Sequence, residues 1–386
     1  MRFVFLSEYL WDAQPEIAAK KLALTISEQF PVIFINPPQY RSKKRNYFQS
    51  KSAGPNLHIY TPTSHMPFLS MLPGWMFAKI QSYFTNKKLA EFIAEITNPS
   101  SSNPAVLINN SLWASELNLV NALKPRAYVF LFNNTLTTNL YSSKKKEKQL
   151  AASCRTADLV VASCNYLRNH AAHYTSKAFT LYEGNCYPLL KKREQATSFT
   201  DVKRVDTPVV AYLGPLNKEL VDIDMLKRIC QRTPNYQYKL LLPYSFRKEE
   251  IELENMPNVK VIFFNKELNL GTHLEQVDVA LYPLAGTHAS LSRFPNEIFS
   301  FMMLKKPVVI NRTINTKPFE TYVRLAYGDN DILSALKEVL EHPDQQTLSE
   351  AQTFATNISW EGAVIKLYQL IYNSTGEVII PQATRK

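Results

Sequence analysis

Short runs of β-branched and aromatic residues alternate along the chain with longer segments whose apolar residues recur at helical spacing. In the first part, this pattern predicts a strand over residues 2–6, a helix over 15–30 and a second strand over 32–35. The alternation continues through six further segments: 105–108, 113–123, 127–132, 157–162, 166–174 and 178–182. Strands that alternate with helices are typical of a parallel sheet covered by helices on both faces.

The periodic pattern stops between residues 189 and 207, where charged residues accumulate before a proline. This predicts a linker between two α/β domains, residues 1–188 and 208–356. The second domain has expected strands at 208–213, 238–242, 259–263, 277–282 and 307–310, and expected helices at 219–232, 295–304 and 331–341. A final helix, capped by Ser359, has an apolar face that needs a partner surface, formed by Trp360, Ile365, Leu367, Leu370 and Ile371.

Composition agrees with two ordinary domains, since 386 residues exceed the size of one typical core. Hydrophobic residues make up 45% and charged residues 20%, which favours neither a disordered chain nor an integral membrane protein. A short apolar run at the start lacks the length of a signal peptide, so we expect a cytoplasmic protein. The four cysteines have no zinc-site spacing and are expected to be free thiols: Cys154, Cys164, Cys186 and Cys230.

The formal net charge of +11 favours an anionic partner or substrate. Nucleic acid, the phosphates of a nucleotide and an acidic membrane face all fit this charge. Basic residues cluster at 41–45 and 144–148, and between them residues 66–88 mix large apolar side chains with lysines. This segment suits either an interfacial helix on anionic lipid or a core-facing helix with a basic outer edge. Charge alone does not choose among these partners.

In doubly wound sheets, ligands bind beyond the carboxyl ends of the strands. This rule selects candidate residues in both domains, and two such sets that face each other predict a ligand cleft. In the second domain it selects Gly214, Tyr244, Asn265 and the loop 284–294. In the first domain it selects Ser7, Glu8, Asn36, Asn109, Asn110, Asn133, Asn134, Glu183, Gly184 and Asn185.

The loop before Pro295 has the chemistry of an anion site. Pro295 fits the first turn of a helix, which places Ser290, Ser292 and Arg293 at or just before the positive helix end. Backbone N–H groups, two hydroxyls and a guanidinium in this position would hold a diphosphate and stabilise it as a leaving group. A capped helix with a solvated arginine explains the same residues.

Other chemistries have little support in the sequence. Asp222 and Asp224 stand at the start of a predicted helix, where capping explains them better than metal binding, and we expect no metal. The motifs G-x-S-x-G, G-x-x-x-x-G-K-[ST] and G-x-G-x-x-G are absent, which argues against hydrolase, P-loop and dehydrogenase readings. No known nucleic-acid module is present, so nucleic acid is the least favoured partner.

Several segments, in the right order along the chain, resemble GT-B glycosyltransferases related to the group-1 (family-four) enzymes. These are residues 11–38, 156–174, 209–243, 277–284, 292–310 and 359–373, and residues 130–139 are also similar to bacterial exopolysaccharide glucuronosyltransferases. The resemblance implies two Rossmann-like domains facing a cleft, with residues 357–386 crossing back to the first domain.

The resemblance also implies a function. The first domain would bind a glycan or lipid-linked acceptor, and the second would bind a nucleotide-sugar donor without a metal or further cofactor. Relatives build bacterial-type surface polysaccharide, which implies a cytoplasmic protein that is peripheral at the inner face of the membrane, with an anionic membrane surface as a partner.

The chain departs from these relatives at the expected site. Where they carry P-x-K-x-x-E-Y, this chain has Glu297 and Ser300 in place of the lysine and the glutamate, and Lys305 replaces a usual glycine. An acidic residue, the candidate general base of relatives, is replaced by Asn133 and Asn134. Glu183 begins the segment that replaces N-G-V-D in relatives.

Two hypotheses follow from these departures. In one, Arg293 binds the diphosphate and Glu8 deprotonates the acceptor. In the other, the chain keeps the fold without turnover and acts as a binding partner or scaffold. The expected catalytic positions are Glu8 and Asn134, and the expected donor-binding residues are Gly214, Tyr244, Asn265, Ser290, Ser292, Arg293, Glu297 and Ser300.

Overall fold

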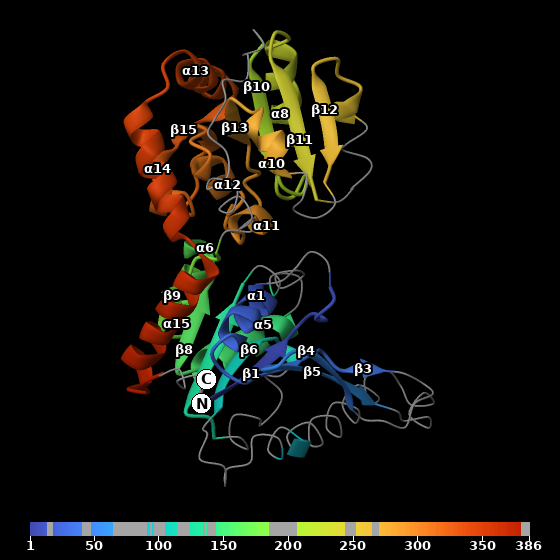
Figure 1. Cartoon of the computed structure of the whole chain (residues 1–386), viewed down its shortest axis with the longest axis vertical. Coiled ribbons are helices and arrows are strands. Elements are labelled where there is room, and N and C mark those ends of the chain that lie inside the picture. Colours follow the sequence, from blue (N-terminus) through green and yellow to red (C-terminus); the bar gives the residue numbers. More distant parts are fainter. Residues whose placement is uncertain are drawn as a thin grey trace. The chain divides into compact units, whose positions relative to one another are not determined.

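The structure is a computed structural model whose elements are labelled in Figure 1. It describes residues 1–13, 18–40, 48–64, 91–92, 95, 105–113, 124–133, 136, 144–184, 207–243, 252–264 and 270–379. Contacts divide the chain into two compact units. Unit 1 comprises Met1–Tyr182 and Ala363–Lys386, and unit 2 comprises Glu183–Gly362.

Unit 1 is built on a nine-stranded sheet in which β4 pairs with β5 antiparallel and the other pairs are parallel. The order across the sheet is β3-β5-β2-β1-β6-β7-β8-β9. Because β2 and β6 pair with opposite sides of β1, the strand order reverses between β1 and β6. The strands are β1 (Arg2–Ser7), β2 (Val32–Ile35), β3 (Gln39–Tyr40), β4 (Phe48–Gly54), β5 (Leu57–Ser64), β6 (Ala105–Asn110), β7 (Ala127–Phe132), β8 (Leu159–Ala162) and β9 (Ala178–Thr180).

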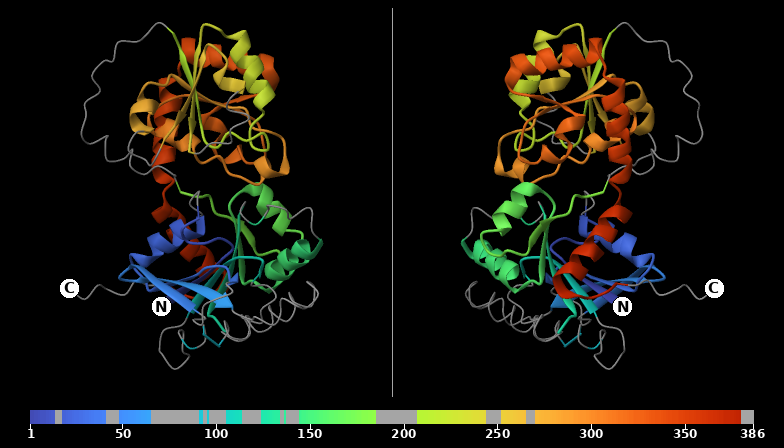
Figure 2. Two further views of the ribbon diagram at one scale, coloured as in Figure 1. Left: turned by 90° about the vertical axis from the view of Figure 1, so that its right-hand side faces the viewer. Right: turned by 90° about the vertical axis from the view of Figure 1, so that its left-hand side faces the viewer.

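The last helix, α15 (Trp360–Thr375), contributes its greater part to unit 1 (Figure 2). Tyr368 packs its ring against Phe3 and Phe30, with both centroid distances 5.9 Å. The expected cap is confirmed, because Ser359 Oγ accepts a hydrogen bond from the Gly362 N–H at 3.1 Å. The expected return of this helix to the first domain is therefore confirmed.

The predicted apolar face of α15 is wrong at one position. The side chain of Ile365 is 58% exposed. The helical period places it opposite the buried stripe of Ala363, Val364, Leu367, Leu370 and Ile371. In the described part of unit 1, further helices are α1 (Ala18–Ser27), α5 (Lys144–Thr156) and α6 (Asn165–Ala171).

Unit 2 is built on a six-stranded, fully parallel sheet in the order β12-β11-β10-β13-β14-β15. Counted along the chain, this is the 3-2-1-4-5-6 order of the Rossmann fold, whose ligand crevice lies where the order reverses, between β10 and β13. The predicted doubly wound architecture is confirmed. The strands are β10 (Val209–Leu213), β11 (Gln237–Leu242), β12 (Val259–Phe263), β13 (Val279–Tyr282), β14 (Val308–Asn311) and β15 (Arg324–Ala326).

Three helices of unit 2 begin at a side chain that accepts from a free N–H group of the first turn: α8, α11 and α14. Asp222 caps α8 (Ile223–Arg232) by accepting from the Met225 N–H at 2.9 Å, which confirms the capping interpretation. Within the described residues the remaining helices are α10 (Leu270–Glu275), α11 (His288–Leu291), α12 (Ile298–Met303), η3 (Lys317–Tyr322), α13 (Gly328–Glu341) and α14 (Gln345–Asn357). Of these, α12 packs against α14.

The predicted helix at 295–304 starts later than expected. Residues 295–297 form a tighter turn, in which the Ile298, Phe299 and Ser300 N–H groups donate to carbonyls three residues back, and α12 begins at Ile298. After α12, Lys305 has φ 54°, a left-handed conformation that favours glycine. This explains why a glycine is usual at this position in the family that the chain resembles.

Several expectations lie outside the described residues. They include the basic cluster at 41–45, the apolar and basic segment 66–88, and the linker 189–207 except for its last residue. The domain boundaries stay a prediction. In the part of the chain that the structure describes, no helix combines the length and apolar character needed to cross a bilayer.

Candidate functional site

The loop 284–294, which the sequence selected, follows β13 at the carboxyl ends of the central strands of unit 2. We call the region at the carboxyl ends of β10 and β13, where the strand order reverses, the β10–β13 edge. Thr287 caps α11 by accepting from the Ser290 N–H at 3.1 Å, and its hydroxyl donates to the carbonyl of Glu219. Ser290 donates its hydroxyl to the carbonyl of Leu220 at 3.2 Å. These bonds tie α11 to the segment that follows β10. These bonds therefore hold the loop near the carboxyl ends of β10 and β13, where the strand order reverses.

The two serines of this loop are less available than the sequence suggested. Ser292 is fully buried and donates its hydroxyl to the carbonyl of Ala289 at 3.0 Å. The backbone N–H groups of Leu291, Ser292 and Arg293 donate to carbonyls within α11 or its cap. These three amides are therefore used by α11, a short helix that is separate from the one predicted to open at Pro295. The donor-binding role of Ser290 and Ser292 stays a prediction.

Arg293 supplies the positive charge at this edge. Its guanidinium forms an ion pair with the carboxylate of Glu297, four residues later. The arginine side chain is 24% exposed and that of Glu297 only 6%. A guanidinium has five N–H donors, more than one carboxylate can accept from. Glu297, which replaces the lysine of relatives, thus partly neutralises the arginine and fixes its direction.

A second carboxylate acts on the same guanidinium. Burial raises the pKa of Glu183 to about 7, while attraction by Arg293 lowers it and repulsion by Glu297 raises it further. Glu183 is the first residue of unit 2, so all three groups belong to one unit. The cluster therefore carries one cation and two carboxylates, and one of these carboxylates changes its charge near neutral pH.

A small cavity opens beside this cluster. Its volume of about 20 Å³ holds on the order of one water molecule. Gly214 lies at its side with φ 141°, and a Cβ there would approach the Tyr212 hydroxyl oxygen at 3.1 Å and Glu297 Oε1 at 3.6 Å. Both the backbone angle and the space thus require glycine. The lining residues are Tyr212, Leu220, Tyr282, Leu284, Ser290, Arg293, Pro295 and Glu297.

Ser300 occupies a different environment from the other expected donor residues. It is fully buried within α12, and its hydroxyl has no hydrogen-bond partner among the described residues. Burial of a hydroxyl without a partner lowers the free energy of unfolding, so this position destabilises the fold locally. In this structure Ser300 exposes no surface to a ligand, and its donor-binding role stays a prediction. Tyr244 and Asn265 lie outside the described residues.

In unit 1, Glu8 follows β1 at the point where the strand order reverses. Its N–H donates to the Asn110 carbonyl at 2.8 Å, and its carboxylate accepts from the Leu112 N–H at 2.9 Å. Burial raises the pKa of Glu8 above its usual value, against the hydrogen bond from Leu112. A carboxyl with a raised pKa at a strand switch point has the properties of a general base.

The neighbouring strands β6 and β7 end in buried amides. Asn110 Nδ2 donates to the Leu131 carbonyl at 2.8 Å and to Asn133 Oδ1 at 3.1 Å. Asn109 Oδ1 accepts from the N–H and hydroxyl of Ser111 at 3.0 and 2.7 Å. These asparagines stabilise the edge beside Glu8 and have no acid–base function. Asn134 lies outside the described residues, so its expected catalytic position stays a prediction.

The cysteines agree with the expectation of free thiols where they are described. Cys154, Cys164 and Cys230 are buried and unpaired with one another. Burial raises the pKa of Cys154 and of Cys230 to about 12, which keeps both thiols protonated and unreactive. Among the described residues, no three His, Cys, Asp or Glu side chains are arranged to hold a metal ion.

The pKa of Glu183 predicts a pH dependence of stability. The carboxyl titrates near 4.5 when unfolded and near 7 when folded, so the folded state binds more protons between these values. The free energy of unfolding should therefore fall as pH rises from about 4.5 to about 7, by at most roughly 3 kcal/mol from this group. Glu183→Gln should remove this contribution.

Denaturant unfolding of the wild type and of Glu183→Gln at pH 5 and at pH 8 measures this effect. The variant should gain stability relative to the wild type at pH 8 but not at pH 5. Glu341→Gln, which removes an exposed carboxylate of α13, controls for the change in net charge. An equal difference between Glu183→Gln and wild type at both pH values would rule out the proposed titration.

Sequence reasoning missed three residues at the β10–β13 edge. Tyr212 and Tyr282 line the cavity and donate their hydroxyls to the carbonyls of Pro215 and Leu213, at 2.9 and 3.0 Å. Their positions near the ends of two buried strands were the available signal. Asn315 lies four residues after β14, and no local pattern along the chain marks it.

Comparisons with known proteins bear on the fold of the chain. No family model matches the chain. A curated relative, named as the teichuronic acid biosynthesis glycosyltransferase TuaH of Bacillus subtilis (strain 168), is 24% identical over 226 residues. The match spans 55% of this chain and 57% of that protein, so it covers just over half of each.

Solved structures match almost the whole chain. Sucrose-phosphate synthase from Thermosynechococcus elongatus has a TM-score of 0.64 and 16% identity, and covers 96% of this chain and 98% of that one. The Anabaena protein HepE, solved with UDP and glucose, has a TM-score of 0.64 and 12% identity, over 97% and 100% of the two chains. The fold is the GT-B fold of glycosyltransferases, and the resemblance seen in the sequence is confirmed.

Proposed function

We propose that this protein is a glycosyltransferase that moves a sugar from a nucleotide-sugar donor to a glycan or lipid-linked acceptor. The observation that carries the proposal is the guanidinium of Arg293 at the strand order reversal of a GT-B fold. Arg293 is paired with Glu297 and lines the cavity at this edge. In Rossmann-like sheets this is the crevice that receives nucleotide phosphates.

Arg293 suits the donor diphosphate for a chemical reason. When the bond between the sugar carbon and the phosphate oxygen breaks, the electron pair stays on the diphosphate, and its negative charge grows. A partly buried guanidinium stabilises that charge through strong, charge-assisted hydrogen bonds. No acid then needs to protonate the leaving group. This role requires no metal from the protein.

Glu8 suits the acceptor step. Its carboxylate would take the proton of the acceptor hydroxyl as the acceptor oxygen forms the new bond to the sugar carbon. The raised pKa of Glu8 brings its proton affinity closer to that required at neutral pH. A hydrogen bond from the Leu112 N–H at 2.9 Å orients the carboxylate. Unit 1 would thus bind the acceptor and supply the base.

The biosynthetic role and the donor class are proposed from the names of the similar proteins. The name of the Bacillus subtilis relative assigns it to teichuronic acid biosynthesis, and HepE was solved with UDP and glucose. We therefore propose a role in bacterial-type surface polysaccharide synthesis with a uridine-type donor. A cytoplasmic location and an anionic membrane surface as partner remain proposals, and the segment 66–88 that suggested the membrane lies outside the described residues.

A second candidate function has its own supporting observation. Glu297 pairs with Arg293 and reduces the positive charge that a diphosphate would meet. Ser300 is buried where relatives carry a ribose-binding glutamate. Both features fit a GT-B protein that binds a partner or nucleotide without turnover.

Purified protein incubated with a panel of nucleotide sugars separates the two candidates. For the enzyme, we expect a raised melting temperature with one donor, and release of the nucleoside diphosphate when an acceptor glycan is added. Stabilisation without release, across the acceptor panel, would support the binding function. A melting temperature that no nucleotide sugar changes would contradict both.

A further inference from the structure

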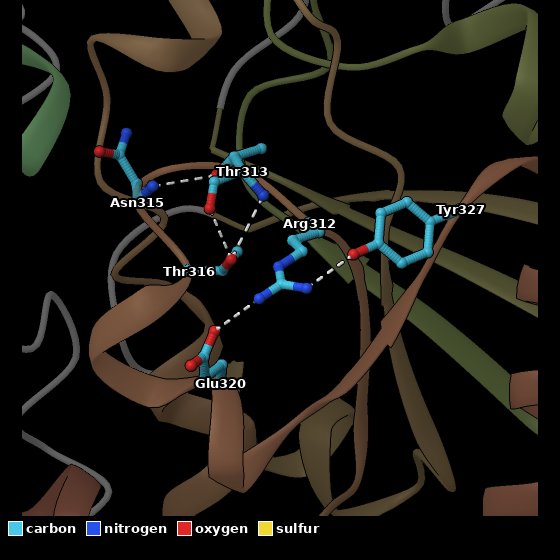
Figure 3. A network of polar contacts seen from close by, with 6 residues as sticks. All are labelled: Arg312, Thr313, Asn315, Thr316, Glu320 and Tyr327. Atoms are coloured by element: carbon cyan, nitrogen blue, oxygen red, sulfur yellow. Dashed lines mark hydrogen bonds and ion pairs between the residues drawn. The ribbon is translucent and has the colours of Figure 1, made fainter.

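The loop that carries Arg293 rests on a turn that follows β14. Figure 3 shows the polar contacts of this turn and its neighbours. The Thr313 N–H donates to Thr316 Oγ1 at 3.2 Å, and that hydroxyl donates back to the Thr313 carbonyl at 2.7 Å. The Asn315 N–H donates to Thr313 Oγ1 at 3.3 Å. Both threonine hydroxyls thus hold the backbone on which Asn315 sits.

The side chain of Asn315 spans from this turn to the candidate donor site. It is 1% exposed, and Nδ2 donates to the Leu291 carbonyl at 2.6 Å and to the Arg293 carbonyl at 3.2 Å. An amide nitrogen has two N–H donors, so these two bonds use both. The carbonyls belong to the end of α11 and to the arginine itself. Asn315 therefore attaches the backbone of Arg293 to the β14 side of the sheet.

This attachment bears on the direction of the guanidinium. Arg293 follows the last residues of a helix only four residues long, which by itself restrains its backbone weakly. The ion pair with Glu297 restrains the far end of the side chain, and Asn315 restrains the near end. An anion site needs donors held in place before the ligand arrives, because reorganisation reduces affinity.

We infer that Asn315 is a positioning residue, which holds Arg293 in the direction that binds the donor diphosphate. The inference rests on the proposed function and deepens it. Asn315 itself touches no ligand, since it is buried beneath the loop. Its effect on nucleotide affinity passes through Arg293, and this separates it from a residue that only stabilises the fold.

Asn315→Asp tests this role at nearly constant volume. A carboxylate has no N–H donors and repels the two carbonyls. We expect the affinity for the nucleoside diphosphate that the wild type binds, chosen from UDP, GDP, CDP and ADP by calorimetry, to fall by roughly 5- to 50-fold. In an Arg293→Ala background the same change should cause no further loss, because the group that Asn315 positions is gone.

Asn258→Asp is the matched control. Asn258 Nδ2 also donates to backbone carbonyls of unit 2, those of Cys230, Thr233 and Tyr236, at 3.0, 3.2 and 3.3 Å. Asn258 precedes β12 and so lies at the amino end of the sheet, opposite the site. This variant should lower the free energy of unfolding and keep the nucleotide affinity of the wild type.

The outcomes separate this inference from the proposed function. A wild type that binds a nucleoside diphosphate and an Asn315→Asp variant of equal affinity would overturn the positioning role alone. Equal losses in the wild-type and Arg293→Ala backgrounds would also overturn it. A wild type that binds none of the four nucleotides would overturn the proposed function and this inference together. If Asn315→Asp does not fold, Asn315→Ser, which keeps one donor, replaces it with a smaller expected loss.

Discussion

Replacing Glu8 by glutamine is expected to lower the rate of sugar transfer by about 10²- to 10⁴-fold, the usual contribution of a general base. Glutamine keeps an oxygen that accepts from the Leu112 N–H, so the local fold should survive. It has no basic group at neutral pH and so loses the step in which the acceptor hydroxyl gives up its proton. Affinity for the donor should stay within about twofold of the wild type, because Glu8 belongs to unit 1.

The pH profile makes this test specific. Because burial raises the pKa of Glu8, the wild-type rate should rise with pH through a value above the usual range of a carboxyl group. This rise of the transfer rate with pH should be absent in Glu8→Gln. Glu28→Gln, which removes an exposed carboxylate just after α1, is the control and should transfer sugar like the wild type. Wild-type rates in Glu8→Gln would remove Glu8 from the mechanism.

The second large effect is expected for Arg293→Ala, which should weaken nucleoside diphosphate binding by roughly 10- to 100-fold. A hydrogen bond to a charged group contributes about 1.5–3 kcal/mol, and each 1.4 kcal/mol is about tenfold in affinity. The loss should shrink at high salt, because the missing interaction is partly electrostatic. Calorimetric titration of wild type and variant with the same nucleotide measures both effects.

Two further variants show whether the loss comes from the guanidinium itself. Arg293→Ala leaves the buried Glu297 carboxylate without its cation, which destabilises the site by itself. Glu297→Gln removes the negative charge but keeps a side-chain oxygen that can accept from Arg293, so the arginine stays directed and is less neutralised. Nucleotide affinity should therefore be kept or increased. Arg312→Ala removes an exposed arginine of the same unit that contacts Tyr327 and Glu320, and should leave affinity unchanged. Weaker binding in Glu297→Gln than in Arg293→Ala would contradict this assignment.

The order of elements was accessible from the sequence because it depends on local patterns. Apolar runs of strand length alternate with helical periods, and this alternation predicts parallel sheets whose functional loops follow the strands. Gly214, Glu8 and Arg293 were selected in this way, and the structure places each beside a strand order reversal. Caps were predictable for the same reason, as Asp222 and Ser359 show, because they act within three residues.

The availability of each polar group was decided by the tertiary structure alone. The Ser290 hydroxyl donates to the carbonyl of Leu220, which is 70 residues away, and the Ser290 N–H donates to Thr287 Oγ1 in its own turn. This serine therefore holds the loop in place. Residue spacing gave no sign that Glu183 and Glu297 act on one guanidinium, since 114 residues separate them.

The sequence by itself therefore determined which residues lie at the carboxyl ends of the strands, because side-chain periodicity and helix capping are local. Only the tertiary structure decided which of them share an environment, because strand order brings distant segments together. Asn315 shows the difference most clearly. Nothing in its neighbourhood along the chain marks it, yet the pairing of β14 with β13 puts its amide under the carbonyls of Leu291 and Arg293.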